Sequence, residues 1–158
     1  MNDLTTLTRR PSIWFGNGRA TIRLSAAESD SAISFIEHHV PYGDSPPLHI
    51  HLNEDEVFMV HEGTVRMRIA AVELILRAGD IAVAPRGIPH SFRVETLSGA
   101  RFTTICRGAD FETLVVQSGR PAIAPGLPEA QRPDAGMQAA LASLAAANGI
   151  EIIGAPLG

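Results

Sequence analysis

Lysine is absent from this 158-residue sequence, whose 13 basic residues are all arginine. This absence excludes any mechanism that needs a lysine Schiff base or a lysine general base. Cysteine is nearly absent as well, with Cys106 as its single occurrence. A disulfide within the chain and a zinc site built from several cysteines are therefore ruled out.

Long hydrophobic runs are also missing, since no apolar stretch approaches the roughly 20 residues that a membrane helix needs. Residues 1–10 are polar and rich in threonine, unlike the apolar segment of a signal peptide. Together with the lone cysteine, this pattern predicts a cytoplasmic protein with no membrane partner.

The net charge of −4 comes from acidic residues spread along the chain. Such a distribution offers no basic surface for nucleic acid, so we expect no nucleic-acid partner. The composition favours a small-molecule partner instead.

Residues 12–108 alternate between short β-like runs and turn residues, which is typical of an antiparallel barrel or sandwich. The run 64–69 places Val65, Met67 and Ile69 on one face, and residues 72–76 follow closely enough to pair with it as a hairpin. Further strands are expected at 20–24, 32–40, 56–61, 80–84, 90–95 and 101–107. The predicted fold class is all-β.

The pattern changes after residue 108. Residues 109–117 predict a short helix, 119–133 form a proline-rich strap, and 134–147 predict a second helix with Asp134 as its N-cap. Because an isolated helix of this length is marginal, we expect its stripe of Met137, Leu141 and Leu144 to dock on the barrel or on a second subunit. A packing appendage is favoured over a functional lid. The expected division is a flexible tail at 1–11, a barrel at 12–108 and an extension at 109–158 packed on the barrel.

The segment 46–56 carries the chemistry. His49 and His51 are two positions apart, so on a strand both imidazoles project from one face and reach one ion. Glu56 follows His51 by an odd offset and would face the other way on a continuous strand. A turn at 52–55 must therefore intervene, after which Glu56, Phe58 and Val60 point inward together.

Two runs in this region have fixed spacings of glycines and polar residues. The first is Gly43, five residues, His49-x-His51, four residues, Glu56, six residues, Gly63; the second is Gly79, five residues, Pro85-x-Gly87, two residues, His90. The 15 residues between the two runs suffice for one hairpin. Both runs resemble the two motifs of the cupin superfamily, and the closest likeness, from residue 12 to the C-terminus, is to bacterial quercetin-dioxygenase-like cupins.

This resemblance implies a single jelly-roll cupin β-barrel with a short C-terminal helical appendage. It also implies that His49, His51, Glu56 and His90 bind one divalent metal ion per chain. One position departs from the second motif, because Val94 stands where the family usually has asparagine. That asparagine is not a ligand, so the departure concerns the turn after the strand and leaves the metal site unaffected.

Three histidines and a carboxylate form a mixed nitrogen and oxygen set that suits Fe(II), Mn(II), Ni(II) or Co(II), and zinc and copper stay open. The alternative, a buried polar cluster with no metal, is disfavoured because burying such groups without partners costs several kcal/mol.

The same inward parity makes some apolar residues candidates for the substrate pocket, with core packing as their alternative role. These candidates are Phe58, Val60, Met67 and Phe92, and Glu37 is a further polar candidate. His38 and His39 face opposite ways, so whichever of them faces inward is expected near the pocket. His61 is expected to be solvated.

Three functions stay open at this point. By resemblance, the first is a dioxygenase in which Glu56 acts as the catalytic base on a flavonol or similar enol, with O2 as the second substrate. The second is an isomerase, hydrolase or lyase that uses the metal to polarise a carbonyl. The third is a binding module without catalysis. The resemblance also implies a homodimer.

Overall fold

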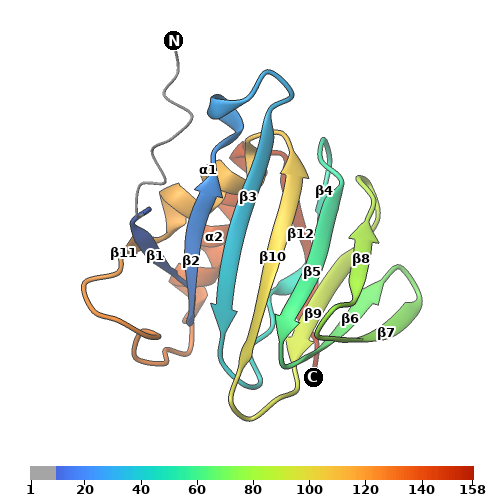
Figure 1. Ribbon diagram of the computed structural model, residues 1–158, viewed down its shortest axis with the longest axis vertical. Helices are drawn as coiled ribbons and strands as arrows, with labels where there is room; N and C mark the ends of the chain where they lie inside the picture. Colours follow the sequence, from blue (N-terminus) through green and yellow to red (C-terminus); the bar gives the residue numbers. More distant parts are fainter. Residues whose placement is uncertain (1–9) are drawn as a thin grey trace.

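Two antiparallel β-sheets face each other in the computed structural model, which describes residues 10–158 (Figure 1). The seven-stranded sheet has the order β11-β1-β2-β3-β10-β5-β8, and the five-stranded sheet has the order β12-β4-β9-β6-β7. The expected all-β cupin barrel is confirmed. Residues 1–9 of the tail expected at 1–11 lie outside the described residues.

The strands are β1 Ser12–Phe15, β2 Gly18–Leu24, β3 Ile33–Val40, β4 Pro47–His51, β5 Glu56–Glu62, β6 Thr64–Ile69, β7 Val72–Arg77, β8 Ile81–Ala84, β9 His90–Val94, β10 Ala100–Arg107, β11 Arg120–Pro121 and β12 Ile150–Pro156. The helices are the 3-10 turn η1 Ala26–Glu28, α1 Asp110–Ser118 and α2 Ala135–Ala147. The strand predictions from residue 20 to 107 are confirmed to within about two residues, a common difference at strand ends. The sequence argument did not assign β1, β11 and β12 as strands.

Strand register aligns the inward residues of the seven-stranded sheet in rows. In one row Cys106 of β10 pairs with Ser34 of β3 and with Glu56 of β5. In another, Phe102 pairs with His38 and Val60. Because side chains alternate along a strand, these pairings fix which polar groups share the interior with the apolar core.

The main core lies between the two sheets. Its fully buried members include Phe102 of β10, Val60 of β5 and Met67 of β6, and Phe92 of β9 packs against them. The predicted hairpin of 64–69 with 72–76 is confirmed as β6 and β7, with Val65, Met67 and Ile69 turned toward the core.

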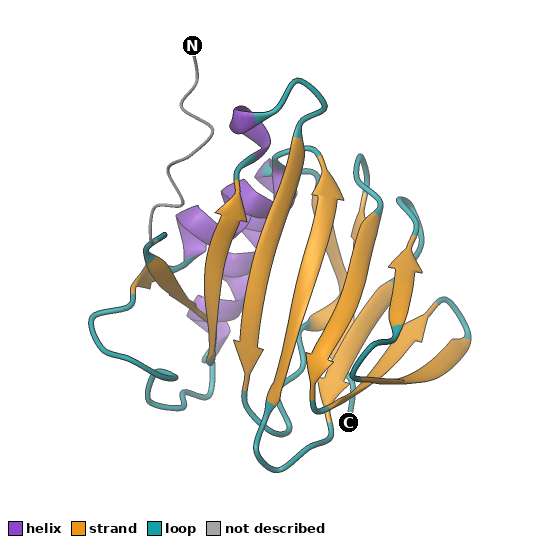
Figure 2. Cartoon of the chain, in the orientation of Figure 1, coloured by secondary structure: helices purple, strands orange, loops and turns teal. Residues whose placement is uncertain are grey.

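The helices lie behind β2 and β3, where they cover the open side of the two sheets (Figure 2). Val115 of α1 packs against Ile36, and Ala145 of α2 packs with Ile150 of β12. The second predicted helix is confirmed as α2, with the Asp134 carboxylate accepting a hydrogen bond from the Met137 amide. The segment after α2 forms β12, which pairs with β4, so the five-stranded sheet extends beyond residue 108.

Within residues 10–158, neither α-helix is both long and apolar enough to cross a bilayer.

Gly63 and Gly87 provide a matched test of backbone constraint, because both have positive φ, 84° and 78°. A Cβ on Gly63 would lie 2.6 Å from the Gly99 carbonyl oxygen, whereas a Cβ on Gly87 would meet nothing within 4 Å. We expect Gly87→Ala to lower the free energy of unfolding by about 1–2 kcal/mol, the cost of left-handed backbone. Gly63→Ala should lower the free energy of unfolding by clearly more than Gly87→Ala does, as measured by urea unfolding. Equal losses would contradict the predicted clash.

Candidate metal centre

His49 and His51 lie on β4, between β12 and β9. His49 pairs with Ile152 on one side and with His90 on the other, and His51 pairs with Ile150. The i, i+2 spacing turns both imidazoles toward the interior, and the ring centroids of His49 and His90 are 4.4 Å apart.

Glu56 comes from the opposite sheet, at the first position of β5. The turn at 52–55 carries the chain from one sheet to the other, as the odd offset predicted. The Leu52 amide donates to the Gly149 carbonyl at 2.8 Å, and the Gly87 amide donates to the His51 carbonyl at 2.7 Å. These bonds fix the turn so that Glu56 faces the three histidines.

The four side chains form one cluster in which each offers a ligand atom within 4.8 Å of the others. Glu56 Oε2 lies 3.1 Å from His90 Nε2 and 3.5 Å from His51 Nε2. His51, Glu56 and His90 are each no more than 2% exposed, and His49 is partly buried.

Backbone carbonyls set the tautomers of two of the histidines. His49 Nδ1 lies 2.7 Å from the Pro47 oxygen, and His90 Nδ1 lies 3.0 Å from the Ile88 oxygen. A carbonyl only accepts, so both Nδ1 atoms donate, and Nε2 is the atom that each ring can offer to an ion. His90 Nε2 contacts the Glu56 carboxylate at 3.1 Å, a contact that an ion would replace.

The cluster passes a direct test of fit to a metal ion. Both ring nitrogens of His51 are buried without a hydrogen-bond partner among the described residues. Buried polar groups without partners are costly, and a cation among Nε2 atoms and a carboxylate removes that cost. Three imidazoles and one carboxylate also match the donor types that divalent transition metals accept. The cluster can therefore bind such an ion, and the donor set does not select one metal.

Electrostatics prepare these groups for a cation. Burial, reinforced by His90, lowers the pKa of His49 to about 4, so His49 is neutral at pH 7. Burial alone would raise the pKa of Glu56, but the nearby His51 and His90 outweigh it and lower that pKa to about 2. Burial also opposes the charge on His51, yet Glu56 and Glu54 together raise the pKa of this ring. Glu56 is thus a carboxylate, attractive to a positive ion.

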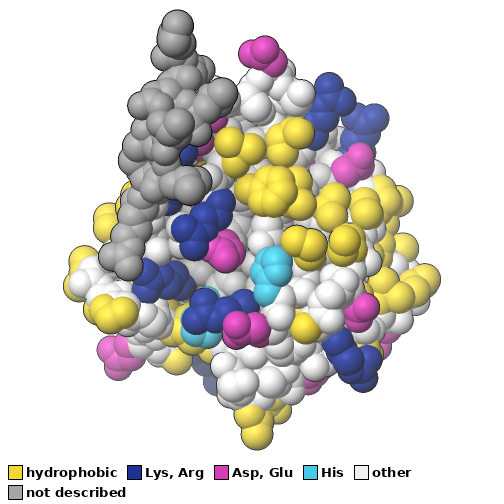
Figure 3. Space-filling view, viewed as in Figure 1, with side chains coloured by type: hydrophobic (Ala, Val, Ile, Leu, Met, Phe, Trp, Pro, Cys, Tyr) yellow, Lys and Arg dark blue, Asp and Glu magenta, His cyan; other side chains and the backbone are white. Residues whose placement is uncertain are grey.

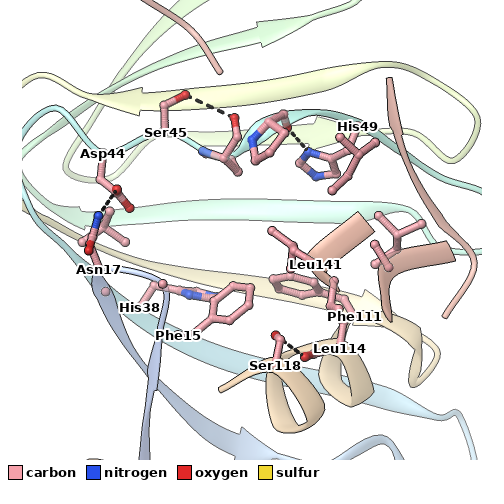
Figure 4. A pocket seen from close by; sticks show the side chains of 18 of the residues that line it. Phe15, Asn17, His38, Asp44, Ser45, His49, Phe111, Leu114, Ser118 and Leu141 are labelled. Atoms are coloured by element: carbon pink, nitrogen blue, oxygen red, sulfur yellow. Dashed lines mark hydrogen bonds between the residues drawn. The ribbon is translucent and has the colours of Figure 1, made fainter. Parts of the chain in front are cut away.

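A cavity of about 600 Å³ opens beside the cluster. Its walls come from both sheets, from α1 and α2, and from the strap between them. Figure 4 shows Phe111 and Leu114 of α1 and Leu141 of α2 across the cavity from His49. All three residues of the predicted stripe on α2 line the cavity; Leu141 and Leu144 also pack in the cluster with Ala145, whereas Met137 is 47% exposed.

The predicted pocket residues separate into three groups. Phe58 and Phe92 line the cavity. Val60 and Met67 lie in the core between the sheets and do not reach it. Glu37 is a correction: it takes the outward position on β3 and pairs with Arg23, because the inward position belongs to its neighbour His38.

The outer face of the seven-stranded sheet carries other charged pairs of this kind, and Figure 3 shows arginine and acidic side chains in contact there. His61 is exposed as expected and contacts the Thr103 hydroxyl at 2.7 Å. His39 faces outward as well.

His38 is the inward member of its pair and lines the cavity. Its Nε2 lies 2.9 Å from the Thr104 hydroxyl, and its ring stacks on Phe102 with centroids 5.0 Å apart. Burial lowers the pKa of His38 to about 4, so the ring is neutral at pH 7.

Sequence reasoning missed Thr104, Phe102 and Phe111 as cavity residues, and it missed Glu54 beside His51. The alternation of β10 around Cys106 offered a signal for the first two. No sequence signal places Phe111, because its position depends on how α1 packs.

The rings of six side chains form a closed circle beside the cavity, called the aromatic circle below. Neighbouring centroids are 5.0 to 6.3 Å apart in the order His90, Phe58, Phe102, His38, Phe111, His51. All of them except His90 line the cavity. The metal cluster therefore opens onto an aromatic surface. In this circle of side chains, neutral His38 lies opposite the cluster residues His51 and His90.

Comparison with known proteins agrees with this fold. Residues 36–106 match the family model described as a cupin domain. Quercetin 2,3-dioxygenase of Bacillus subtilis (strain 168) is 28% identical over 82 residues, which are 52% of this chain and 24% of that protein. The chain thus spans about a quarter of the length of this relative.

Two solved structures share the architecture. A protein described as a predicted oxalate decarboxylase, from Thermotoga maritima, has a TM-score of 0.59 at 18% identity, over 64% of this chain and 95% of that one. A variant of oxalate decarboxylase from Bacillus subtilis has a TM-score of 0.55 at 21% identity, over 65% of this chain and 28% of that one. At such identities the likeness concerns the fold alone.

Residues 36–106 therefore form a cupin domain within this two-sheet fold. Within the cupin superfamily, the chain resembles the quercetin-dioxygenase-like cupins.

Replacing His49 and His51 together by alanine should abolish metal binding, because it removes two of four donors. Zn(II) at about 100 times its Kd should raise the free energy of unfolding of the unchanged protein by about 2.7 kcal/mol. The double variant should show no rise. His61→Ala, which removes an exposed histidine, is the control and should behave like the unchanged protein. A metal-dependent rise in the double variant would place the ion elsewhere.

His38 should make the metal-free protein less stable in acid. The pKa of His38 is about 4 in the folded protein, against about 6.5 for an unperturbed histidine, so between these values the unfolded chain binds more protons. Stability conferred by neutral His38 is therefore complete above pH 6.5 and is lost as the pH falls toward 4, by about 3 kcal/mol at most. Urea unfolding at pH 7 and 4.5 should show a smaller loss in His38→Gln than in the unchanged protein. An unchanged loss in that variant would contradict the prediction, and His61→Gln is the matched control.

Proposed function

We propose that this protein is a metal-dependent dioxygenase that takes a flavonol or a similar aromatic enol into its cavity and adds O2 to it. The observation that carries the proposal is the opening of a three-histidine, one-carboxylate cluster onto a cavity of about 600 Å³ with aromatic walls. A volume of this size is within the range of sites that enclose a whole small organic molecule.

His49, His51, Glu56 and His90 would hold one divalent transition-metal ion. When bound, the ion supplies Lewis acidity to an enol hydroxyl and open positions for two small ligands. The four side chains come from both sheets, so the barrel itself keeps them in place.

Glu56 is the group that accepts the hydroxyl proton. Its pKa of about 2 keeps it ionised at neutral pH, and its Oε2 faces the cluster. A carboxylate this acidic accepts a proton only from a strongly acidified hydroxyl, and it releases that proton readily. This property suits a base that acts on an activated enol and then returns to its ionised state.

The aromatic circle orients the substrate. Phe58, Phe102 and Phe111 offer faces and edges to a flat aromatic molecule, and such pairs contribute about 0.5–1.5 kcal/mol each beyond burial. His38, hydrogen-bonded to Thr104, is a neutral polar group within the same aromatic circle. It can exchange a hydrogen bond with a second hydroxyl or carbonyl of the substrate.

The C-terminal extension adds apolar wall to the cavity. Phe111, Leu141 and Ile152 of this extension line it. An apolar cover strengthens the interaction between Glu56 and a bound hydroxyl, because water no longer competes for either group.

Oxygen consumption tests the proposal. Quercetin added to protein loaded with Fe(II), Mn(II), Ni(II) or Co(II) should consume O2 in at least one case, in proportion to the flavonol lost. Glu56→Gln should lower kcat by about 100-fold or more, the usual contribution of a general base. Glu37→Gln is the control, since Glu37 lies on the outer face, and it should leave the rate unchanged. Quercetin binding without O2 uptake for all four metals would exclude the oxygenase and leave a binding protein.

A further inference from the structure

Glu54 is a buried carboxylate that the proposed reaction does not use. It is 2% exposed, although glutamate is almost never buried without a partner. Its Oε1 accepts the Asp110 amide at 2.8 Å and its Oε2 accepts the Phe111 amide at 3.0 Å. Both amides belong to the first turn of α1, where the helix dipole also favours an anion.

The same carboxylate faces a ligand histidine. Glu54 Oε2 lies 3.7 Å from His51 Nδ1, and the His51 side chain is 2% exposed. Nδ1 has no hydrogen-bond partner among the described residues. The other ring nitrogen, Nε2, points to Glu56 at 3.5 Å. His51 therefore lies between two carboxylates, one on each side of its ring.

This arrangement separates His51 from the other two histidines of the cluster. His49 and His90 each direct Nδ1 to a backbone carbonyl two residues earlier. No carbonyl serves His51 in this way among the described residues, and a charged side chain from the turn at 52–55 stands in that place. A carboxylate behind a metal-binding imidazole fixes the tautomer and orientation of the ring and raises its basicity as a ligand.

The surroundings leave Glu54 little freedom. A Cβ on Gly108 would lie 2.3 Å from Glu54 Oε1, so this glycine makes room for the carboxylate next to α1. Cys106 completes a buried trio with His51 and Glu54. Both oxygens of Glu54 are already bonded to amides, and burial raises the pKa of the Cys106 thiol. The trio is therefore better suited to hold His51 than to bind a second ion.

We propose that Glu54 is a positioning residue that holds His51 for metal binding through Nδ1 and thereby links the docking of α1 to occupancy of the metal centre. The proposal rests on the metal site of the proposed function, but it does not depend on oxygenase activity. Since coupling between two sites is reciprocal, a metal that fixes His51 must also favour the docked first turn of α1.

Substitution of Glu54 tests the first half. Glu54→Gln keeps the size of the side chain but removes its charge, and we expect Zn(II) affinity to fall by about 10- to 100-fold. The Co(II) complex should also change its visible absorption spectrum. Glu112→Gln is the matched control, because Glu112 lies on α1 and accepts the Ala26 amide at 2.8 Å. Glu112→Gln should change the Zn(II) affinity by no more than about twofold. The thermal stability of both variants is measured without metal to check that each is folded.

Hydrogen exchange of the unchanged protein tests the second half and needs no variant. Zn(II) should slow exchange of the Asp110 and Phe111 amides by about tenfold, within the usual range of coupling between sites. The Arg77 amide, which donates to Asp80 Oδ2 at 2.8 Å in the turn between β7 and β8, is remote from α1 and should exchange as before.

The outcomes separate the two proposals. Zn(II) affinity of Glu54→Gln within about twofold of the unchanged protein, or unchanged exchange of both α1 amides, overturns the role of Glu54 and leaves the metal site standing. An unchanged protein that binds neither Zn(II) nor Co(II) overturns both proposals. A weakened Glu54→Gln in a protein that consumes no O2 supports the role of Glu54 and removes only the oxygenase.

Discussion

The enclosure of three imidazoles and a carboxylate between two sheets is the constraint on which the rest of this structure depends. Polar groups removed from water need partners, and the protein provides hydrogen-bonded ones on the outer side of two of the three rings. Backbone carbonyls hold His49 and His90, and the barrel brings Glu56 to face them from the other sheet. Of the three histidines, only His51 has no hydrogen-bond partner among the described residues, so its ring is the one left for an ion to satisfy.

The C-terminal extension completes both the barrel and the cavity. β12 pairs with the strand that carries His49 and His51, while α1 and α2 cover the cavity beside them. The extension thus reaches the cluster in two ways, through the backbone of β12 and through the α1 amides on Glu54. A segment that looks like a packing appendage in the sequence supplies a wall of the cavity.

The cavity combines two environments that a single strand cannot provide. One side of the cavity holds ionised Glu56 and the ligand histidines. The rest of the aromatic circle consists of phenylalanine rings and neutral His38. Alternation along β3 and β10 brings His38 beside Phe102 and Thr104, while the phenylalanine of α1 comes from the extension. A ligand of this cavity meets charge at one edge and apolar surface over most of its area.

The sequence by itself determined the strands between residues 20 and 107, the turn before Glu56 and the shared face of His49 and His51. These features are local, because strand alternation fixes which side chains share a face. His90 joined them in the sequence only through the resemblance to the second cupin motif. The tertiary structure decided the rest. Glu37 and His38 are neighbours, and only the pairing of β3 with β10 decides that His38 faces inward. Val60 and Met67 face inward like Phe58, but they pack in the core between the sheets and do not line the cavity. Glu54 lies three residues from His51, but Phe111 is far from both in the chain and meets them only because α1 packs against the barrel, a long-range contact that no local pattern encodes.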